Sequence, residues 1–213
     1  MVSDNAVAFD KAFAQMPLIA ILRGITPDES EAILKILVEA GFTLIEVPLN
    51  SPDAFKSIEL MAKSAPEGVL IGAGTVLRAQ DVKRLKEVGG RFVVTPNTDL
   101  SVIEASVSSD MPIANGCMTP TEALAAAKAG ATILKIFPAA RLGAGYIKDI
   151  KAVLPPQLPV VAVGGVGPNE FEEFVAHGVV GFGIGSDLWK PGRTPQDVAA
   201  SAKALVAKWE AIR

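Results

Sequence analysis

The chain is poor in cysteine and histidine, the residues that form disulfides and carry many metal sites and much acid–base catalysis. Its 213 residues include a single cysteine, Cys117, and a single histidine, His177. One cysteine excludes an intrachain disulfide and favours a reducing compartment. One histidine excludes metal sites built from several imidazoles, and a Ser-His-Asp triad would depend on that one ring. An enzyme with this sequence is therefore expected to work with other groups.

Basic residues are not in excess, and long apolar runs are missing. Twenty Lys and Arg side chains stand against 23 Asp and Glu, which gives a formal net charge of −3 at pH 7. Nucleic-acid-binding surfaces carry a clear Lys/Arg excess, so no nucleic-acid partner is expected. No stretch approaches the roughly 18 apolar residues of a membrane span, and residues 1–17 lack the apolar segment of a signal peptide. We therefore expect a cytoplasmic protein without a membrane partner.

Apolar runs of the length of buried strands recur along the chain. Segments of helical periodicity, such as 28–40 and 121–129, lie between them. Prolines at or near the expected first turns and glycines just past the expected helix ends mark the boundaries. These residues are Pro27, Pro52, Pro120, Pro168 and Pro195 at the starts and Gly41, Gly89, Gly130 and Gly178 at the ends. The expected strands are Leu18–Leu22, Leu44–Leu49, Leu70–Val76, Phe92–Thr95, Pro112–Ala114, Ile133–Phe137, Val160–Val163 and Gly181–Ile184.

Eight strand–helix repeats without a break in composition predict one α/β domain over residues 1–213. Near-continuous apolar strands that alternate with helices indicate a parallel sheet buried on both faces. Eight such units favour a (β/α)8 barrel, the TIM barrel, with an extra N-terminal helix at Asn5–Gln15. The alternative is a doubly wound open sheet, which usually has about five or six strands.

A lysine interrupts the sixth expected strand near its C-terminal end, which is where the catalytic groups of a (β/α)8 barrel lie. Lys135 stands there between Leu134 and Ile136. Burying an ammonium is costly, and desolvation lowers the pKa of a lysine, as an amine nucleophile that attacks a carbonyl requires. The alternatives are a structural ion pair and a side chain that reaches solvent at the strand end.

A carboxylate breaks the second expected strand in the same way. Glu46 lies in the apolar run FTLIEVPLN. Apolar surroundings would raise its pKa, whereas the positive charge of a nearby lysine would lower it. A buried amine beside a carboxylate is the minimum set for imine chemistry, in which the amine forms the covalent bond and the carboxylate moves protons. A structural ion pair with Lys135 is the alternative.

Two glycine-rich turns follow the seventh and eighth expected strands. Gly164-Gly165 ends one strand, and Gly185-Ser186 ends the other. TIM barrels often bind a substrate phosphate at this place through backbone N–H groups and a helix N-terminus, although such turns also need glycine for conformational reasons alone. Arg23, at the end of the first expected strand, is a candidate for binding a carboxylate or a phosphate, or it is an exposed loop residue.

Neither the single histidine nor the single cysteine is expected to act in this site. His177 precedes a glycine in a helix-to-strand loop, at the opposite face of the barrel. Cys117, placed after a short fifth strand, is expected to be a packed thiol rather than a nucleophile. The role of Arg141 stays open. The loop formed by residues 189–193 is expected either to line the mouth of the barrel or to form an oligomer contact.

Taken together, a set of motifs makes this sequence similar to a known family. The motifs span residues 18–188, nearly the whole chain, and read LIAILRGITPDE, EVPLNSP, IGAGTVL, VTPN, LKIFPA, AVGGVGPN and GIGSDL. They resemble the class I aldolases of 2-keto-3-deoxy-6-phosphosugar acids. These are homotrimers without metal or cofactor that cleave such an acid to pyruvate and glyceraldehyde 3-phosphate. At Gly143-Ala144 the chain departs from the family, whose members often have Gly-Pro there.

The resemblance implies a role for each residue of the expected site. It implies that Lys135 forms a Schiff base with the substrate and that Glu46 is the proton donor and acceptor. The implied contacts of the substrate carboxylate are Arg23 and Thr75, and those of the substrate phosphate are Gly164, Gly165, Gly185 and Ser186.

Three positions bear on the substrate epimer. Members of the family that act on the gluconate epimer usually carry an arginine in the place of Asn50 and a threonine in the place of Val163. This chain therefore looks like the galactonate type, and Pro96 is expected in the same part of the site. Because an apolar wall discriminates less than a hydroxyl that binds the substrate, we expect a preference for the galacto epimer with incomplete rejection of the gluco epimer. A gluconate-specific or dual-specificity aldolase is the alternative.

Two other classes of protein are further alternatives. A phosphosugar isomerase or epimerase uses the same barrel and phosphate turns but commonly needs metal ligands or a histidine. A non-catalytic sugar-phosphate sensor would keep the glycine turns and would not need Lys135.

Overall fold

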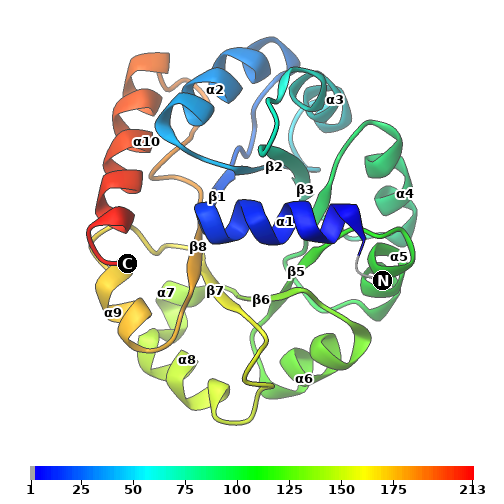
Figure 1. Cartoon of the computed structure of the whole chain (residues 1–213), viewed down its shortest axis with the longest axis vertical. Coiled ribbons are helices and arrows are strands. Elements are labelled where there is room, and N and C mark those ends of the chain that lie inside the picture. The colour runs from blue at the N-terminus through cyan, green and yellow to red at the C-terminus, as the bar shows by residue number, and fades with distance from the viewer. Residues whose placement is uncertain (1–2) are drawn as a thin grey trace.

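The computed structural model describes residues 3–213 as a closed barrel of eight parallel strands surrounded by helices (Figure 1). Each strand pairs with the next strand of the sequence, and β8 pairs with β1. The predicted (β/α)8 barrel is therefore confirmed, and the open sheet is excluded. The strands are β1 (Leu18–Ile21), β2 (Leu44–Pro48), β3 (Leu70–Gly74), β4 (Phe92–Val94), β5 (Ile113–Cys117), β6 (Ile133–Ile136), β7 (Val160–Val163) and β8 (Gly181–Ile184).

Helices connect the strands on the outside of the barrel. Two helices, α7 and α8, lie between β6 and β7, where one was expected. Within residues 3–213, no helix is long and apolar enough to cross a membrane. The helices are α1 (Asp4–Gln15), α2 (Pro27–Ala40), α3 (Ala54–Ser64), α4 (Ala79–Glu87), α5 (Leu100–Ser108), α6 (Pro120–Ala129), α7 (Ala139–Leu142), α8 (Ala144–Lys151), α9 (Phe171–Ala176) and α10 (Pro195–Glu210).

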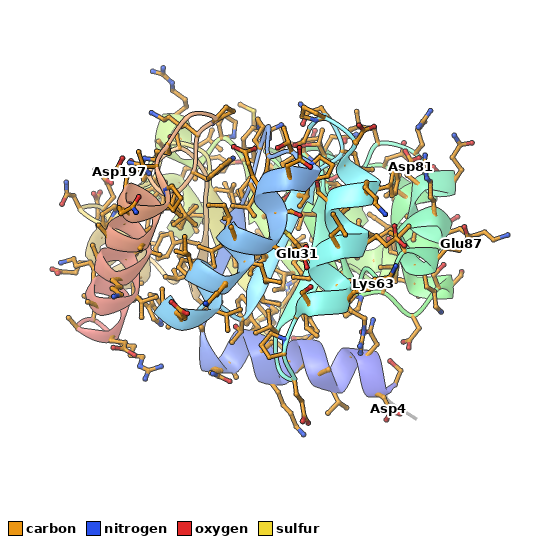
Figure 2. All side chains as sticks on the ribbon, turned by 90° about the horizontal axis from the view of Figure 1, so that it is seen from above. Asp4, Glu31, Lys63, Asp81, Glu87 and Asp197 are labelled. Carbon is orange, nitrogen blue, oxygen red and sulfur yellow. The ribbon has the colours of Figure 1, made fainter. Side chains whose placement is uncertain are left out.

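The helix α1 covers the N-terminal end of the barrel. Asn5 donates from its side-chain amide to the carbonyls of Arg91 and Asp110, which precede β4 and β5. Figure 2 shows α1 on one side of the molecule and the first turns of α4 and α10, marked by Asp81 and Asp197, on the other. Because these helices follow parallel strands, their first turns mark the C-terminal face of the barrel, which α1 leaves uncovered.

Two apolar layers hold the barrel together. One layer lies between the strands and the surrounding helices. The other fills the barrel interior, and Phe9 of α1 closes it from below by packing on Phe92, with ring centroids 5.6 Å apart. The inner layer consists of Phe9, Ala12, Ile19, Ile21, Leu44, Leu70, Phe92, Val94, Ala114, Ile133, Val161 and Val163.

Some helix boundaries differ from the predicted ones. The helix α2 begins at a capping box formed by Thr26 and ends at Gly41 with a φ of 104°, a left-handed conformation that favours glycine. Pro52 and Pro168, by contrast, do not start helices but lie in turns that precede α3 and α9. Before α3 the reason is Asp53, whose positive φ of 42° does not fit the first turn of a helix.

The strand β5 is longer than predicted, and Cys117 is its last residue rather than a loop residue. The prediction stopped at residue 114 because Asn115 is polar. In the structure the buried Asn115 amide donates to the Thr98 hydroxyl at 2.8 Å and accepts from the Thr95 hydroxyl at 3.2 Å. Because buried polar groups are tolerated when their hydrogen bonds are made, an asparagine can stand inside this strand.

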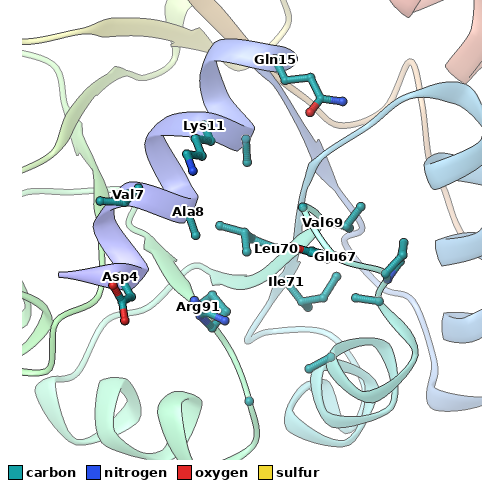
Figure 3. A pocket seen from close by; sticks show the side chains of 16 residues that line it. Asp4, Val7, Ala8, Lys11, Gln15, Glu67, Val69, Leu70, Ile71 and Arg91 are labelled. Carbon is teal, nitrogen blue, oxygen red and sulfur yellow. The ribbon is translucent and has the colours of Figure 1, made fainter.

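A cavity of about 640 Å³ lies at the N-terminal end, between α1 and the segment that leads into β3 (Figure 3). Its lining combines apolar residues such as Leu70 with the charged residues Lys11, Glu67 and Arg91. It opens at the end of the barrel opposite to the strand ends where the site is expected.

Candidate active site

Glu46 and Lys135 both point into the barrel. Each follows a residue of the inner apolar layer, Leu44 or Ile133, by two positions on the same strand. Because side chains two residues apart on a strand share a face, both charged groups lie in the interior, toward the C-terminal ends of β2 and β6. Only 3% of Glu46 and 6% of Lys135 is exposed. The structure thus brings these two residues together in an apolar environment.

Burial determines how Lys135 titrates. Desolvation lowers the pKa of its amine to about 8, with Glu46 opposing this effect and Arg23 adding to it. The amine also faces the ring of Phe137, with Nζ 5.1 Å from the ring centroid. A lysine with so low a pKa has a usable neutral fraction near neutral pH, as a nucleophilic amine requires. A side chain that reaches solvent, one of the alternatives, is not observed.

The carboxyl group of Glu46 accepts no hydrogen bond from the described residues. Its Oε2 atom is buried and has no hydrogen-bond partner within residues 3–213. Burial raises the pKa of this carboxyl to about 7, although the positive charges of Lys135 and Arg23 lower it. Among the described residues, no ion pair of 4.0 Å or less joins Glu46 to Lys135. The structural ion pair is therefore not formed, and a carboxyl that titrates near pH 7 is suited to proton transfer in both directions.

Arg23, Asn50 and Thr75 come together beyond the ends of β1, β2 and β3. Nη1 of Arg23 donates to Oδ1 of Asn50 at 2.6 Å and to Oγ1 of Thr75 at 3.4 Å. Thr75 has a φ of 51°, a left-handed conformation that is strained for a β-branched residue. Strain of this kind persists where the surroundings fix the backbone, and it is frequent at ligand-binding sites. The guanidinium and the hydroxyl thus place hydrogen-bond donors side by side, an arrangement that is suited to an anionic group such as a carboxylate.

The two glycine turns line a single cavity of about 520 Å³ at the C-terminal end of the barrel. Within residues 3–213, the backbone N–H groups of its four turn residues donate to no other backbone group. Free N–H groups that converge on a cavity provide a site for an anion. Arg23 lines the same cavity, together with the turn residues Gly164, Gly165, Gly185 and Ser186.

The helix N-terminus that was expected at this anion site is absent from it. After β7 the helix α9 begins only at Phe171, and after β8 the chain forms turns until α10 begins at Pro195. The carboxylate of Glu170 accepts a hydrogen bond from the N–H of Gly167 at 2.9 Å. This bond lies within the turn at residues 167–170, which separates the glycines from the first residue of α9.

The three specificity candidates lie in different places. Val163 lines the cavity, so it has direct access to a ligand there. Asn50 does not line the cavity, but it accepts a hydrogen bond from Arg23, which does. Pro96 packs its backbone against Gly116 of β5, where any Cβ would collide with it, and it is not among the cavity-lining residues.

Sequence reasoning left the segment after β8 open, and the structure places Trp189, Lys190 and Pro191 in the cavity wall. Trp189 is 3% exposed, and its indole N–H donates to the carbonyl oxygen of Arg23 at 3.2 Å. The sequence feature that could have pointed to this wall is Trp189-Lys190-Pro191, which begins three residues after the turn at Gly185-Ser186. Its contact with Arg23, 166 positions away, could not be read from the sequence. Phe137, which also lines the cavity, was missed because it resembles the other apolar residues of the predicted strand; in the structure it follows the last residue of β6.

The single histidine and the single cysteine do not line the cavity. His177 lies at the end of α9, with Nδ1 2.7 Å from the carbonyl oxygen of Glu173. Burial raises the pKa of the Cys117 thiol to about 12, so it is not a thiolate near neutral pH. Arg141 is exposed on α7 and does not line the cavity. Within residues 3–213, no cluster of three or more His, Cys, Asp or Glu residues could hold a metal ion.

Known proteins are similar to this chain in sequence and in fold. The family model of the KDPG and KHG aldolases matches residues 9–203. The chain belongs to this family. A probable 2-dehydro-3-deoxy-6-phosphogalactonate aldolase of Rhizobium meliloti (strain 1021) is 52% identical over 198 residues, which are 93% of each chain. The 2-dehydro-3-deoxy-6-phosphogalactonate aldolase of Escherichia coli (strain K12) is 44% identical over 93% of this chain and 98% of its own.

The solved structures of KDPG and KHG aldolase family members include a similar barrel. A native KDPGal structure, 44% identical in sequence, matches with a TM-score of 0.91 over 93% of this chain and 96% of its own. The members are aldolases, which are carbon–carbon lyases. The family and the aldolase class predicted from the motifs are therefore confirmed.

Proposed function

We propose that this chain is a Schiff-base aldolase that cleaves 2-dehydro-3-deoxy-6-phospho-D-galactonate reversibly to pyruvate and D-glyceraldehyde 3-phosphate. The observation that carries the proposal is the buried pair in the barrel interior. Its amine, Lys135, has a pKa lowered to about 8, and its carboxyl, Glu46, has a pKa raised to about 7. Family membership supports the reaction class, and the two phosphogalactonate aldolases among the relatives support the substrate.

Lys135 provides the electron sink of the reaction. Its neutral amine adds to the C2 ketone, and the carbinolamine loses water to give a protonated imine. Removal of the C4 hydroxyl proton breaks the C3–C4 bond. C4 becomes the aldehyde carbon, and the bonding pair moves toward the imine and forms an enamine. Protonation of C3 and addition of water then release pyruvate and restore the amine.

Glu46 is the group placed to move these protons. As a carboxylate it accepts the proton of the C4 hydroxyl, and as a carboxylic acid it returns a proton to C3 of the enamine. A pKa near 7 lets one group perform both steps without a large penalty in either state. Because no close ion pair ties Glu46 to Lys135, the carboxylate is free to reach the substrate directly or through one water molecule.

The two anionic ends of the substrate need local partners, because a chain with a net charge of −3 provides no general positive field. We assign the carboxylate of the substrate to Arg23 and Thr75, whose donors converge beyond β1 and β3. We assign the phosphate to the two glycine turns, which line the cavity and whose N–H groups donate to no other backbone group among the described residues. The cavity-lining residues of these turns are Gly164, Gly165, Gly185 and Ser186.

The epimer preference follows from the cavity wall near β7. Val163 presents methyl groups there, which cannot hydrogen-bond a substrate hydroxyl. We therefore assign the galacto epimer as the preferred substrate, with residual cleavage of the gluco epimer. Equal or better cleavage of the gluco epimer would instead assign a 2-dehydro-3-deoxy-6-phosphogluconate or dual-specificity aldolase.

The proposal includes assembly as a homotrimer in the cytoplasm. Exposed apolar side chains on α5 and α6 and in the loop between β5 and α6 support a subunit contact, since isolated chains rarely expose large apolar patches. A mass of three chains in light scattering is the expected result. These side chains are Leu100, Val107, Met118 and Leu124.

The deciding experiment traps the imine. Borohydride reduction in the presence of pyruvate is expected to leave one adduct, on Lys135, in mass spectra of the digested protein. Lys148→Arg, at an exposed position on α8, is the matched control and should leave the adduct unchanged, whereas Lys135→Arg should abolish it. Absence of an adduct, or an adduct at another lysine, would refute the assignment. Release of pyruvate from each C4 epimer then tests the substrate.

A further inference from the structure

The segment between β8 and α10, orange in Figure 1, is fixed on both sides of one cationic residue. Before Lys190, the N–H groups of Leu188 and Trp189 bond to the carbonyl of Gly185, and the Trp189 indole donates to Arg23. After it, Pro191 packs on Gly24, where any Cβ would meet Pro191 Cγ at 2.8 Å. The backbone of Lys190 is therefore held in place, while its side chain is exposed and lines the cavity of the glycine turns.

The glycine turns themselves carry no positively charged side chain that could pair with a phosphate. Asp187 lines the cavity, and its Oδ2 lies 3.5 Å from the Cβ position of Gly167. The carboxylate of Glu170 lies beside Gly167 as well and accepts a hydrogen bond from the Gly167 N–H, although Glu170 does not line the cavity. Two carboxylates thus stand beside turns that offer only backbone dipoles and one hydroxyl, whereas a phosphate monoester carries a charge of about −1.5 to −2 at pH 7.

The cavity lining contains two cations, and one of them is already engaged. Arg23 is bonded to Asn50 and Thr75, on the side of the site assigned to the substrate carboxylate. Lys190 takes part in no ion pair and no side-chain hydrogen bond among the described residues, so its charge is available. Arg141, on α7, does not line the cavity.

We propose that Lys190 binds the phosphate of the substrate and makes the enzyme select phosphorylated over unphosphorylated sugar acids. This inference rests on the proposed aldolase function, because it assigns one more contact to the same substrate. Lys190 neutralises charge that the glycine N–H groups cannot, and it offsets the nearby Asp187 and Glu170. Its place on a loop anchored to Arg23 sets a fixed separation between the phosphate end and the carboxylate end of the site.

The experiment compares three variants on two substrates. Lys190→Gln removes the charge, Lys190→Arg keeps it, and Arg141→Gln removes an exposed cation outside the cavity. The substrates are pyruvate with D-glyceraldehyde 3-phosphate and pyruvate with D-glyceraldehyde, both measured in the direction of addition. For the phosphorylated aldehyde, Lys190→Gln should raise KM about tenfold, equivalent to about 1.4 kcal/mol, with little change in kcat. For D-glyceraldehyde it should change neither constant, and the other two variants should behave as wild type.

Direct binding of inorganic phosphate, measured by calorimetry, extends the test to a readout without turnover. Lys190→Gln should weaken this binding, and added salt should reduce the difference from wild type. Equal losses on both aldehydes, an unchanged KM for the phosphorylated one, or an equal loss in Arg141→Gln would overturn the inference. These outcomes require an active wild type. A wild type with neither turnover nor a pyruvate adduct would instead refute the proposed function.

Discussion

The carboxylate of Glu46 occupies the space that a side chain at position 74 would fill. A Cβ built on Gly74 would overlap Oε2 of Glu46 and crowd the rest of its carboxyl group. The two residues lie on neighbouring strands, where Glu46 pairs with Gly72 and Pro48 with Gly74 in the register of β2 and β3. The missing side chain on β3 therefore provides the niche in which the carboxyl is buried.

Gly74→Ala is expected to displace this carboxyl and to lower kcat by about 100-fold, since a shift of about 1 Å in a catalytic group costs that much. The displaced carboxyl gains solvent, so its pKa should fall from about 7 toward its ordinary value. The acid limb of the pH–rate profile should move to lower pH accordingly. Steady-state kinetics between pH 5 and pH 9 measure both effects.

Gly145→Ala is the matched control, because a Cβ at Gly145 meets no atom within 4 Å. It should leave kcat and the pH profile unchanged. Overpacking at position 74 is expected to cost about 1–3 kcal/mol of folding stability, which thermal unfolding can monitor. A folded Gly74→Ala protein with wild-type kcat and an unshifted acid limb would show that Glu46 does not depend on this niche.

The sequence predicted the barrel well because the relevant signals are local. Apolar runs and helix ends such as Thr26 and Gly41 depend on neighbouring residues alone. Lys135 and Glu46 were visible for a similar reason, since a charge inside an apolar run is unusual wherever the run is placed. The niche at Gly74 was not visible, because it exists only once β2 and β3 are side by side.

Long-range contacts account for the rest of what the sequence missed. Asn115 looked like the end of a strand because its partners, Thr95 and Thr98, come from the preceding unit. The place of Lys190 in the cavity wall could not be chosen from the sequence, because its loop is held by the hydrogen bond from Trp189 to Arg23, at the other end of the chain. Such contacts follow from closing the barrel between β8 and β1, and single-sequence patterns do not contain them.

The pH dependence of cleavage should report the two buried groups. Glu46 acts as a carboxylate and Lys135 as a neutral amine, so both must lose a proton first. With pKa values of about 7 and about 8, kcat/KM for cleavage should rise with pH through this range and then level off. These two pKa values describe the joint titration of Glu46 and Lys135, because the charge on each residue shifts the pKa of the other. Measurements of kcat/KM for the wild type at a series of pH values test this rise.

Glu46→Gln tests the role of Glu46 separately from that of Lys135. It should lose most of the cleavage activity but still form the pyruvate imine, because Lys135 remains. Removing the negative charge of Glu46 also removes an interaction that raises the pKa of Lys135, so borohydride trapping should extend to lower pH than in the wild type. Trapping that instead requires higher pH than in the wild type would contradict this charge coupling.

Asn50→Ala tests whether the hydrogen bond at 2.6 Å positions Arg23. Without this acceptor the guanidinium gains rotational freedom, so KM for pyruvate in the addition direction should rise about tenfold, equivalent to about 1.4 kcal/mol, with a smaller change in kcat. Asn97→Ala, at an exposed asparagine beyond β4, is the control and should be neutral. An equal loss in both variants, or no loss at Asn50, would show that Arg23 is positioned by other contacts.

Val163→Thr tests the basis of epimer selection, because it adds a hydroxyl to the cavity wall at nearly constant volume. For the gluco epimer, kcat/KM should rise relative to the galacto epimer by about tenfold, the scale of one new hydrogen bond to a substrate hydroxyl. Val163→Ala removes methyl groups without adding a donor, so it separates the effect of space from that of hydrogen bonding. It should change both epimers alike. If Val163→Thr leaves the ratio of the two kcat/KM values unchanged, discrimination at C4 must come from other residues of the cavity, and the assignment of Val163 as the specificity residue is wrong.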